Sequence, residues 1–262
     1  MPATPVTLAL IHGLGASRHC WQMMLPMLAA AGLRGAPVEL PGYGENRRRR
    51  PAKTIEEMAD AAAETIDGLG AERVVVVGHS MGGLVATAIA ERAASVAERI
   101  VIINSSLTVA SRVTAHRGSE GLIRKPLIGR IAWRVAPRAK LRNGLRSAFA
   151  PNFPVPDLFV DDLKACSWAT FTRSSAAMDD YLGRGSLPER LDAIPTPSNL
   201  IYGMQDLRID HDAIASICDR AGGRVTRIED AGHSPMWETP RVAADAILAA
   251  VGATTTRAPA PH

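Results

Sequence analysis

Residues 74–83 read VVVVGHSMGG. The four valines form a run that is apolar along its whole length, which is typical of a strand buried on both faces of a parallel sheet. The run leads into Gly78-His79-Ser80-Met81-Gly82, the G-x-S-x-G pattern of a sharp turn between a strand and a helix. Such a turn strains the backbone, and the residues two positions away must be small so that strand and helix can approach each other. The stretch therefore predicts a buried strand, a tight turn that exposes the Ser80 hydroxyl, and a helix.

On both sides of this stretch the chain alternates apolar strands with helices. We expect strands at residues 6–11, 36–40, 73–78, 99–104, 198–203 and 224–229. We expect helices at 21–31, 54–67, 81–92, 211–222 and 242–250, the second of which starts with the capping-box pair Thr54 and Glu57. Strands that alternate with helices are typical of an α/β fold, here a mostly parallel sheet with helices on both faces.

The alternation stops between Ser105 and about Pro195. This part has a helical pattern that is interrupted by five prolines, Pro126, Pro137, Pro151, Pro154 and Pro156. We therefore expect a core formed by residues 1–104 and 196–254, and a helical lid formed by residues 105–195. The last residues, 255–262, are expected to be a disordered tail.

Composition narrows the class of protein. No apolar run reaches the roughly 18 residues of a membrane span, so stable membrane insertion is not expected. The N-terminal residues show no basic region ahead of an apolar stretch, so no signal peptide is expected. Three cysteines, Cys20, Cys166 and Cys218, have no metal-type spacing and are interpreted as reduced thiols. These features together favour a cytoplasmic protein.

A serine hydroxyl becomes a good nucleophile when a base, oriented by an acid, removes its proton. In chain order Ser…Asp…His, the acid and the histidine follow later strands. Asp206 lies three residues beyond the strand at 198–203, and His233 follows the strand at 224–229. Because ligands of open α/β sheets bind at the carboxyl edge of the strands, we predict that these three side chains meet there.

Other acids and histidines were weighed for the same roles. Asp210 is the second candidate for the acid, although it lies near the start of a helix, where a carboxylate more often acts as a cap. His211 is interpreted as a solvated residue. His79, next to the nucleophile, is interpreted as a packing residue that points away from it.

Two backbone amides are predicted to hold the oxyanion of the reaction. The first is that of Met81, which follows the nucleophile, and the second is that of Leu14 in the loop His12-Gly13-Leu14-Gly15. One such donor is worth roughly 3 kcal/mol of transition-state stabilisation. His12 is interpreted as a brace for this loop.

With these motifs in place, the chain resembles the α/β-hydrolase superfamily. The matching segments are IHGLG, ELPGYGENR, VVVVGHSMGG, YGMQD and AGHSPMWETP, in the expected order, and they cover roughly residues 6–104 and 198–250. The resemblance implies a Ser-His-Asp triad under a helical lid. Family members often begin with an antiparallel hairpin that five residues cannot supply, so we expect fewer than eight strands. A serine nucleophile argues against the branches that use aspartate, and the chain is more similar to carboxylesterases and carbon–carbon bond hydrolases.

The residues and the resemblance together predict a serine hydrolase that cleaves an ester, or a related activated acyl compound, through an acyl-enzyme intermediate. No metal or organic cofactor is needed for this chemistry. Carbon–carbon bond hydrolysis, thioester release, perhydrolysis and cyclisation by the same triad remain alternatives, as does a binding module without activity. Trp21, Trp168 and Trp237 are candidate walls of the substrate pocket, with core packing as the alternative for each.

Charge is concentrated in one part of the chain. Residues 107–156 contain a single acid, Glu120, and carry about +9, whereas the whole chain carries +4. The interpretations left open are a solvated lid surface, docking of an acidic carrier protein, and attraction of an anionic or lipid-like substrate at a membrane surface. Family esterases that act on carrier-bound esters, to which the chain is broadly similar, have a lid of that kind. Few aromatic residues interleave with the charges, so nucleic acid is not an expected partner. The basic residues are Arg112, Arg117, Arg124, Lys125, Arg130, Arg134, Arg138, Lys140, Arg142 and Arg146.

Overall fold

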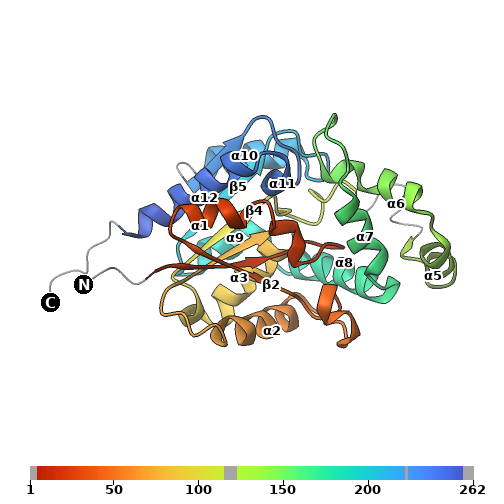
Figure 1. Ribbon diagram of the computed structural model, residues 1–262, viewed down its shortest axis with the longest axis horizontal. Coiled ribbons are helices and arrows are strands. Elements are labelled where there is room, and N and C mark those ends of the chain that lie inside the picture. Colours follow the sequence, from red (N-terminus) through yellow and green to blue (C-terminus); the bar gives the residue numbers. More distant parts are fainter. Residues whose placement is uncertain (1–4, 115–122, 222–223, 256–262) are drawn as a thin grey trace.

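The computed structural model describes residues 5–114, 123–221 and 224–255, and its centre is a six-stranded sheet (Figure 1). The strand order is β2-β1-β3-β4-β5-β6, and every neighbouring pair is parallel. The predicted parallel sheet is therefore confirmed. The strands are β1 (Thr7–Ile11), β2 (Arg34–Val38), β3 (Val74–His79), β4 (Arg99–Ile103), β5 (Ser198–Gly203) and β6 (Val225–Ile228).

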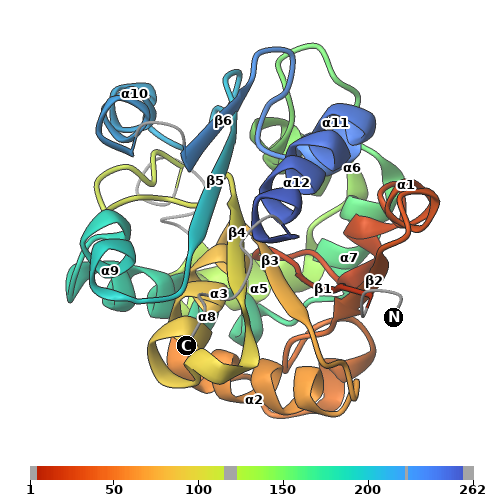
Figure 2. The same cartoon turned by 90° about the vertical axis from the view of Figure 1, so that its left-hand side faces the viewer.

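Helices cover both faces of this sheet, as predicted. In Figure 2, α1, α11 and α12 lie on one side of the strands, and α2, α3 and α9 lie on the other. The α-helices are α1 (Leu25–Ala30), α2 (Ile55–Asp67), α3 (Met81–Arg92), α5 (Pro126–Val135), α6 (Arg138–Leu145), α7 (Asp157–Ala165), α8 (Trp168–Gly183), α9 (Leu187–Ala193), α10 (His211–Ala221), α11 (Pro235–Glu238) and α12 (Pro240–Thr255). Short 3-10 helices are η1 (Arg18–Trp21), η2 (Gly44–Arg48), η3 (Ala94–Val96) and η4 (Arg146–Ala148).

Strand β3 shows how the apolar run of the sequence builds two cores. Successive side chains of a strand point to opposite faces of the sheet. Val76 accordingly packs in one buried cluster with residues of α2 and α3, and Val75 and Val77 pack in a second cluster with residues of α1 and α12. All three valines are fully buried. Strand β3 therefore lies between the two buried clusters, and packing on both faces of the sheet supports the end of the strand, where Ser80 follows.

Two predicted elements differ from the observed ones. The predicted strand at 36–40 is found at 34–38, because Leu40 has left the sheet and its N–H instead contacts His12 Nε2 at 3.3 Å. Pro37 is tolerated in this strand since β2 is the edge strand. The predicted helix at 21–31 is shorter in the structure, where η1 ends at Trp21 and α1 begins at Leu25 with Pro26 at its start, where proline is favourable.

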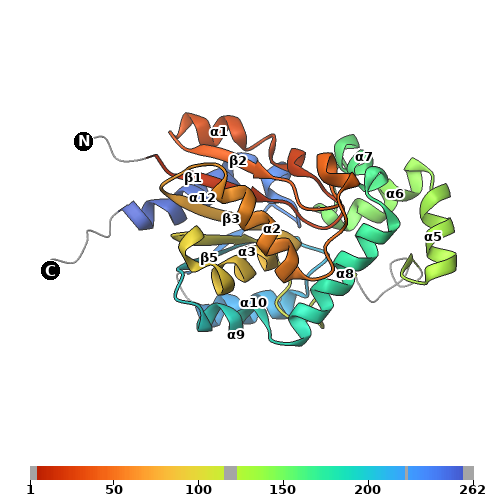
Figure 3. The ribbon, with the colours of Figure 1, turned by 90° about the horizontal axis from the view of Figure 1, so that it is seen from below.

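Residues 104–197, here called the β4–β5 segment, connect β4 to β5 and contain α5 to α9 in their described part. Helices α5, α6 and α7 lie beyond one end of the sheet, opposite the end where β1 begins (Figure 3). The division into a core and a lid stays a prediction. Of the predicted tail, residues 256–262 lie outside the described residues. Within the described ranges, every helix is too short or too polar to cross a membrane.

Candidate active site

The turn after β3 has the geometry that its glycines predict. Ser80 has φ 54° and ψ −116°, a conformation that is costly for any residue other than glycine. A Cβ on Gly78 would lie 2.1 Å from the carbonyl oxygen of Gly82, and a Cβ on Gly82 would lie 2.3 Å from that of Ile11. Both glycines are therefore required for α3 to pack this closely against the sheet.

Ser80, His233 and Asp206 form one continuous chain of hydrogen bonds. The Oγ of Ser80 lies 3.0 Å from Nε2 of His233, and Nδ1 of the same ring lies 2.7 Å from Oδ2 of Asp206. A carboxylate only accepts hydrogen bonds, so Nδ1 carries the proton and Nε2 accepts from the serine hydroxyl. The three residues follow β3, β5 and β6, so the structure brings them together at the carboxyl edge of the sheet as the sequence predicts.

The carboxyl group of Asp206 is fully buried and has four hydrogen-bond donors. Oδ1 accepts from the backbone N–H of Arg208 at 2.7 Å and of Ile209 at 3.3 Å, and Oδ2 accepts from His233 and, at 2.7 Å, from Nδ2 of Asn104. Burial alone raises the pKa of this group, but the charge and hydrogen bonds of His233, and then those of its other donors, outweigh burial and lower the pKa overall. The group is therefore a carboxylate near neutral pH.

Asn104 was missed by the sequence analysis as a member of this network. It directly follows β4, is fully buried and has φ 46°, a value that asparagine adopts more readily than most residues. Its Oδ1 accepts from the N–H of Gly203 at 3.1 Å while its Nδ2 holds Asp206. The signal was present in the sequence, because a polar residue ends the apolar run RIVIIN next to the strand that carries the nucleophile.

The second candidate acid has another role. Oδ1 of Asp210 accepts from the N–H of Ala213 at 3.0 Å, so this carboxylate caps α10. His211, interpreted as solvated, donates from Nε2 to the carbonyl oxygen of Asp206 at 2.7 Å. Of the two candidate acids, Asp206 is the one that is hydrogen-bonded to His233.

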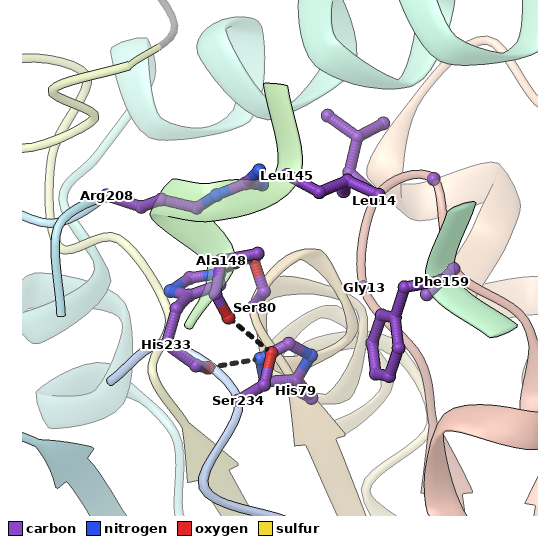
Figure 4. A pocket seen from close by; sticks show the side chains of 12 residues that line it. Gly13, Leu14, His79, Ser80, Leu145, Ala148, Phe159, Arg208, His233 and Ser234 are labelled. Carbon is purple, nitrogen blue, oxygen red and sulfur yellow. Dashed lines mark hydrogen bonds between the residues drawn. The ribbon is translucent and has the colours of Figure 1, made fainter. Parts of the chain in front are cut away.

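His79 packs against the site but does not point away from it, so this part of the interpretation is wrong. Its Nε2 donates to the carbonyl oxygen of His233 at 2.7 Å, and the two rings meet edge to face at 5.0 Å (Figure 4). Burial, followed by repulsion from His233, lowers the pKa of His79 to about 3. The ring is therefore neutral near pH 7 and fixes the backbone of the residue beside it.

A narrow crevice of about 20 Å³ opens onto Ser80, and Gly13, Leu14, Arg208 and His233 are among its walls (Figure 4). A Cβ on Gly13 would lie 3.1 Å from the Cβ of Ser80, which shows how closely the loop approaches the serine. The two amides predicted to hold an oxyanion therefore belong to the loop and the helix that adjoin Ser80. Their role stays a prediction.

His12 is buried behind this loop. Its Nδ1 lies 3.0 Å from the carbonyl oxygen of Gly13, and its Nε2 lies 3.0 Å from Oε1 of Glu39. Burial raises the pKa of Glu39, but its hydrogen bond and charge interaction with His12 lower it overall. These contacts fit the interpretation of His12 as a brace.

Glu238 is a second residue that the sequence analysis missed. Its Oε2 accepts from the N–H groups of Gly232 at 2.9 Å and Ala150 at 2.7 Å, and its Oε1 accepts from that of Ser234 at 2.8 Å. The carboxylate thus holds the backbone on both sides of His233 and joins it to the β4–β5 segment. No local pattern distinguishes this residue, because an acid in a short helix is equally consistent with solvent exposure.

None of the three tryptophans proposed as pocket walls lines this crevice. Trp21 is fully buried in the core cluster that includes α1 and α12. Trp168 donates from Nε1 to the carbonyl oxygen of Ile123 at 2.8 Å, and Trp237 packs edge to face on Phe159 with ring centroids 5.3 Å apart. Among the four tryptophans, it is Trp133 that lines a cavity near the site.

The chain is similar to proteins of known class over most of its length. Residues 8–246 match the model of the alpha/beta hydrolase family. The pimeloyl-[acyl-carrier protein] methyl ester esterase of Aromatoleum aromaticum is 28% identical over 254 residues, covering 89% of this chain and 93% of the relative. Among solved structures, an esterase from Exiguobacterium antarcticum has a TM-score of 0.76 at 19% identity, covering 95% of this chain and 92% of that one. An N-acyl homoserine lactonase has a TM-score of 0.75 at 19% identity, covering 100% and 93%. The chain therefore belongs to the alpha/beta hydrolase family and is an enzyme, as the sequence predicts.

Proposed function

We propose that the protein is a serine hydrolase that cleaves a carboxylic ester through an acyl-enzyme intermediate. The observation that carries this proposal is the hydrogen-bonded chain from Asp206 through His233 to the Oγ of Ser80. This arrangement is the general solution for making a serine hydroxyl nucleophilic. The similarity to esterases supports an ester as the substrate.

In the proposed reaction, Ser80 Oγ attacks the ester carbonyl carbon while Nε2 of His233 takes the hydroxyl proton. Asp206 stabilises the imidazolium that forms, and the amides of Leu14 and Met81 hold the negative charge on the carbonyl oxygen. His233 then returns the proton to the leaving alcohol, and the acyl group stays on Ser80. Water, deprotonated by the same histidine, releases the acid and restores the serine.

A covalent label and a substrate panel test this proposal. A fluorophosphonate should label the protein at one serine, Ser80, at a rate that falls when the histidine is removed in His233→Ala. A panel of p-nitrophenyl esters of increasing acyl length, run beside a thioester, should show turnover of esters. Labelling of another residue, or turnover of the thioester alone, would contradict an ester hydrolase that acts through Ser80.

Glu238→Gln is expected to lower both stability and activity. A carboxamide has one accepting oxygen, so at least one of the three backbone N–H groups that Glu238 binds loses its acceptor. We expect a loss of about 1–3 kcal/mol in the free energy of unfolding, measured by urea denaturation. Because the affected groups flank His233, kcat should fall about 10-fold with little change in KM. Unchanged kcat at reduced stability would show that Glu238 supports the fold without positioning the histidine.

The basic residues of the β4–β5 segment are divided into two groups in the structure. Arg112 and Arg124 pair with Asp179, and Arg138 and Arg142 pair with Asp157. Arg117 lies outside the described residues. Within the described part of residues 107–156, five exposed cations have no ion pair, namely Lys125, Arg130, Arg134, Lys140 and Arg146. Three of them lie on α5 and α6.

We propose that this surface attracts an acidic carrier protein that presents the acyl ester. The named relative acts on a carrier-bound ester, which supports the proposal, and long-range attraction between exposed charges raises association rates. We expect kcat/KM for a carrier-bound methyl ester to fall roughly 10-fold between low and 0.3 M salt, because screening shortens the range of these charges. A small neutral ester serves as the control. The double variant Arg130→Gln with Arg134→Gln should flatten the salt dependence, and a salt-independent kcat/KM would contradict docking by charge.

A further inference from the structure

A second space adjoins the crevice at Ser80. Leu14, Leu145 and Arg208 line both the crevice and a cavity of about 140 Å³. The rest of the cavity wall comes mainly from α5, α6, α7 and α8. Because the crevice itself measures only about 20 Å³, a part of the substrate that the crevice is too small to hold has room in the cavity beside it.

The wall of this cavity is mostly hydrocarbon. Apart from Lys140 and Arg208, the residues that the structure places on it are apolar or glycine. Trp133 and Phe171, whose ring centroids lie 4.8 Å apart, supply an aromatic part of the wall. The polar atom of the Trp133 ring, Nε1, donates to the carbonyl oxygen of Cys166 at 2.9 Å, so it does not need a partner in the ligand. Such a wall binds an apolar group, because burial removes that group from water.

Helix α5 forms the side of the cavity away from the serine. Ala132, Trp133 and Ala136 line the cavity, and none of the three lines the crevice. Residue 136 is three and four positions after the other two, so the three side chains share one face of the helix. Leu145, by contrast, is buried and lines both spaces, so it lies where they meet. The side chains of α5 therefore determine how far a group can extend from Ser80.

We propose that the cavity binds a hydrocarbon group of about six carbons, and that Ala132 and Trp133 set the upper limit of its length. The size follows from the volume, because an apolar cavity of roughly 150 Å³ holds a benzene molecule, and this one measures about 140 Å³. The inference rests on the proposed ester hydrolysis at Ser80 and names the substrate class of the same site. The hydrocarbon group belongs either to the acyl part or to the alcohol part of the ester.

Two series of neutral esters test the proposal on the wild-type enzyme. The acyl series runs from p-nitrophenyl acetate to p-nitrophenyl decanoate, and the alcohol series runs from ethyl acetate to decyl acetate. In one of the two series we expect kcat/KM to rise about two- to fourfold with each added CH₂, the range expected when a CH₂ group leaves water. The rise should level off at about six carbons, where the cavity is full. The series that shows this profile identifies the part of the ester that the cavity holds.

Variants of α5 then assign the profile to the cavity. Ala132→Leu adds carbon atoms to the wall, so kcat/KM for the six-carbon ester should fall about 10-fold relative to the acetate, and the rise should level off about two carbons earlier. Trp133→Leu removes part of the wall and should let the rise continue to longer chains. Ala139→Leu is the matched control, because it makes the first change at an exposed residue of α6 that lines neither space. If Trp133→Leu folds poorly, Ala132→Leu keeps the test valid, since leucine is a good helix former.

The outcomes separate this inference from the proposed function. Hydrolysis of the acetates with no rise in either series would overturn the hydrocarbon site and leave the serine hydrolase intact. A rise that continues to ten carbons in the wild-type enzyme would overturn the limit set by α5. An equal change of the profile in Ala139→Leu and Ala132→Leu would also overturn the inference, since the effect would then not come from the cavity. Loss of all turnover in Ser80→Ala bears on the proposed function alone.

Discussion

Ser80→Ala is expected to reduce kcat by about 10⁴-fold or more on any ester that the wild-type enzyme hydrolyses. The change removes one oxygen atom, the one that lies 3.0 Å from Nε2 of His233. The remaining groups still bind substrate and the oxyanion, so a small residual rate over the uncatalysed reaction is expected. The measurement is steady-state hydrolysis of p-nitrophenyl esters, with the fluorophosphonate label as an independent readout of the nucleophile.

Stability and a matched serine provide the controls for this variant. Alanine keeps the Cβ that the strained turn already accommodates at φ 54°, so Tm should stay within a few degrees of the wild-type value. Ser95→Ala, an exposed serine on η3, should leave kcat unchanged. Retained turnover in a folded Ser80→Ala enzyme would show that another group attacks the substrate.

The predictable parts of this fold are those in which the local pattern of apolar residues and glycines determines the secondary structure. The run VVVV and the glycines around Ser80 predict a strand, a turn and a helix because each residue is constrained by its immediate neighbours. Strand β2 was displaced by two residues for a tertiary reason, since Leu40 contacts His12 instead of continuing the sheet. An edge strand with a proline has a weak local pattern, and the contact that ends it lies 28 residues away.

The site shows the same division between local and distant constraint. Ser80, Asp206 and His233 follow strands, and parallel strands end at one edge, so their convergence was predictable without knowing any distance. Asn104 and Glu238 act on other residues of the site, and such contacts have no spacing rule. Part of the basic segment is paired with Asp157, Asp161 and Asp179, and a local charge count does not show this because these acids lie farther along the chain.

Asp206→Asn is expected to lower kcat by about 10⁴-fold while the protein stays folded. The amide that replaces the carboxylate has one oxygen, and Oδ2 of Asp206 presently accepts from both Asn104 and His233. An NH₂ group facing His233 favours the tautomer in which Nδ1 accepts and Nε2 carries the proton. In that tautomer the ring has no lone pair for the Ser80 hydroxyl.

Asp210→Asn is the matched control, because it makes the same chemical change at the acid that caps α10. This variant should lose about 1 kcal/mol of stability or less and keep its kcat within about twofold.

The pH dependence of the free energy of unfolding gives a second readout of the Asp206 carboxylate. Because the pKa of Asp206 is lowered in the folded protein, its ionisation stabilises the fold above the unfolded pKa of about 3.9, and that contribution disappears as pH falls through the folded value. The difference in free energy of unfolding between wild type and Asp206→Asn should therefore narrow from pH 6 to pH 3.

A large loss of kcat in Asp210→Asn with a small one in Asp206→Asn would show that Asp210 is the catalytic acid. The hydrogen-bonded chain through Asp206 would then not be the catalytic one.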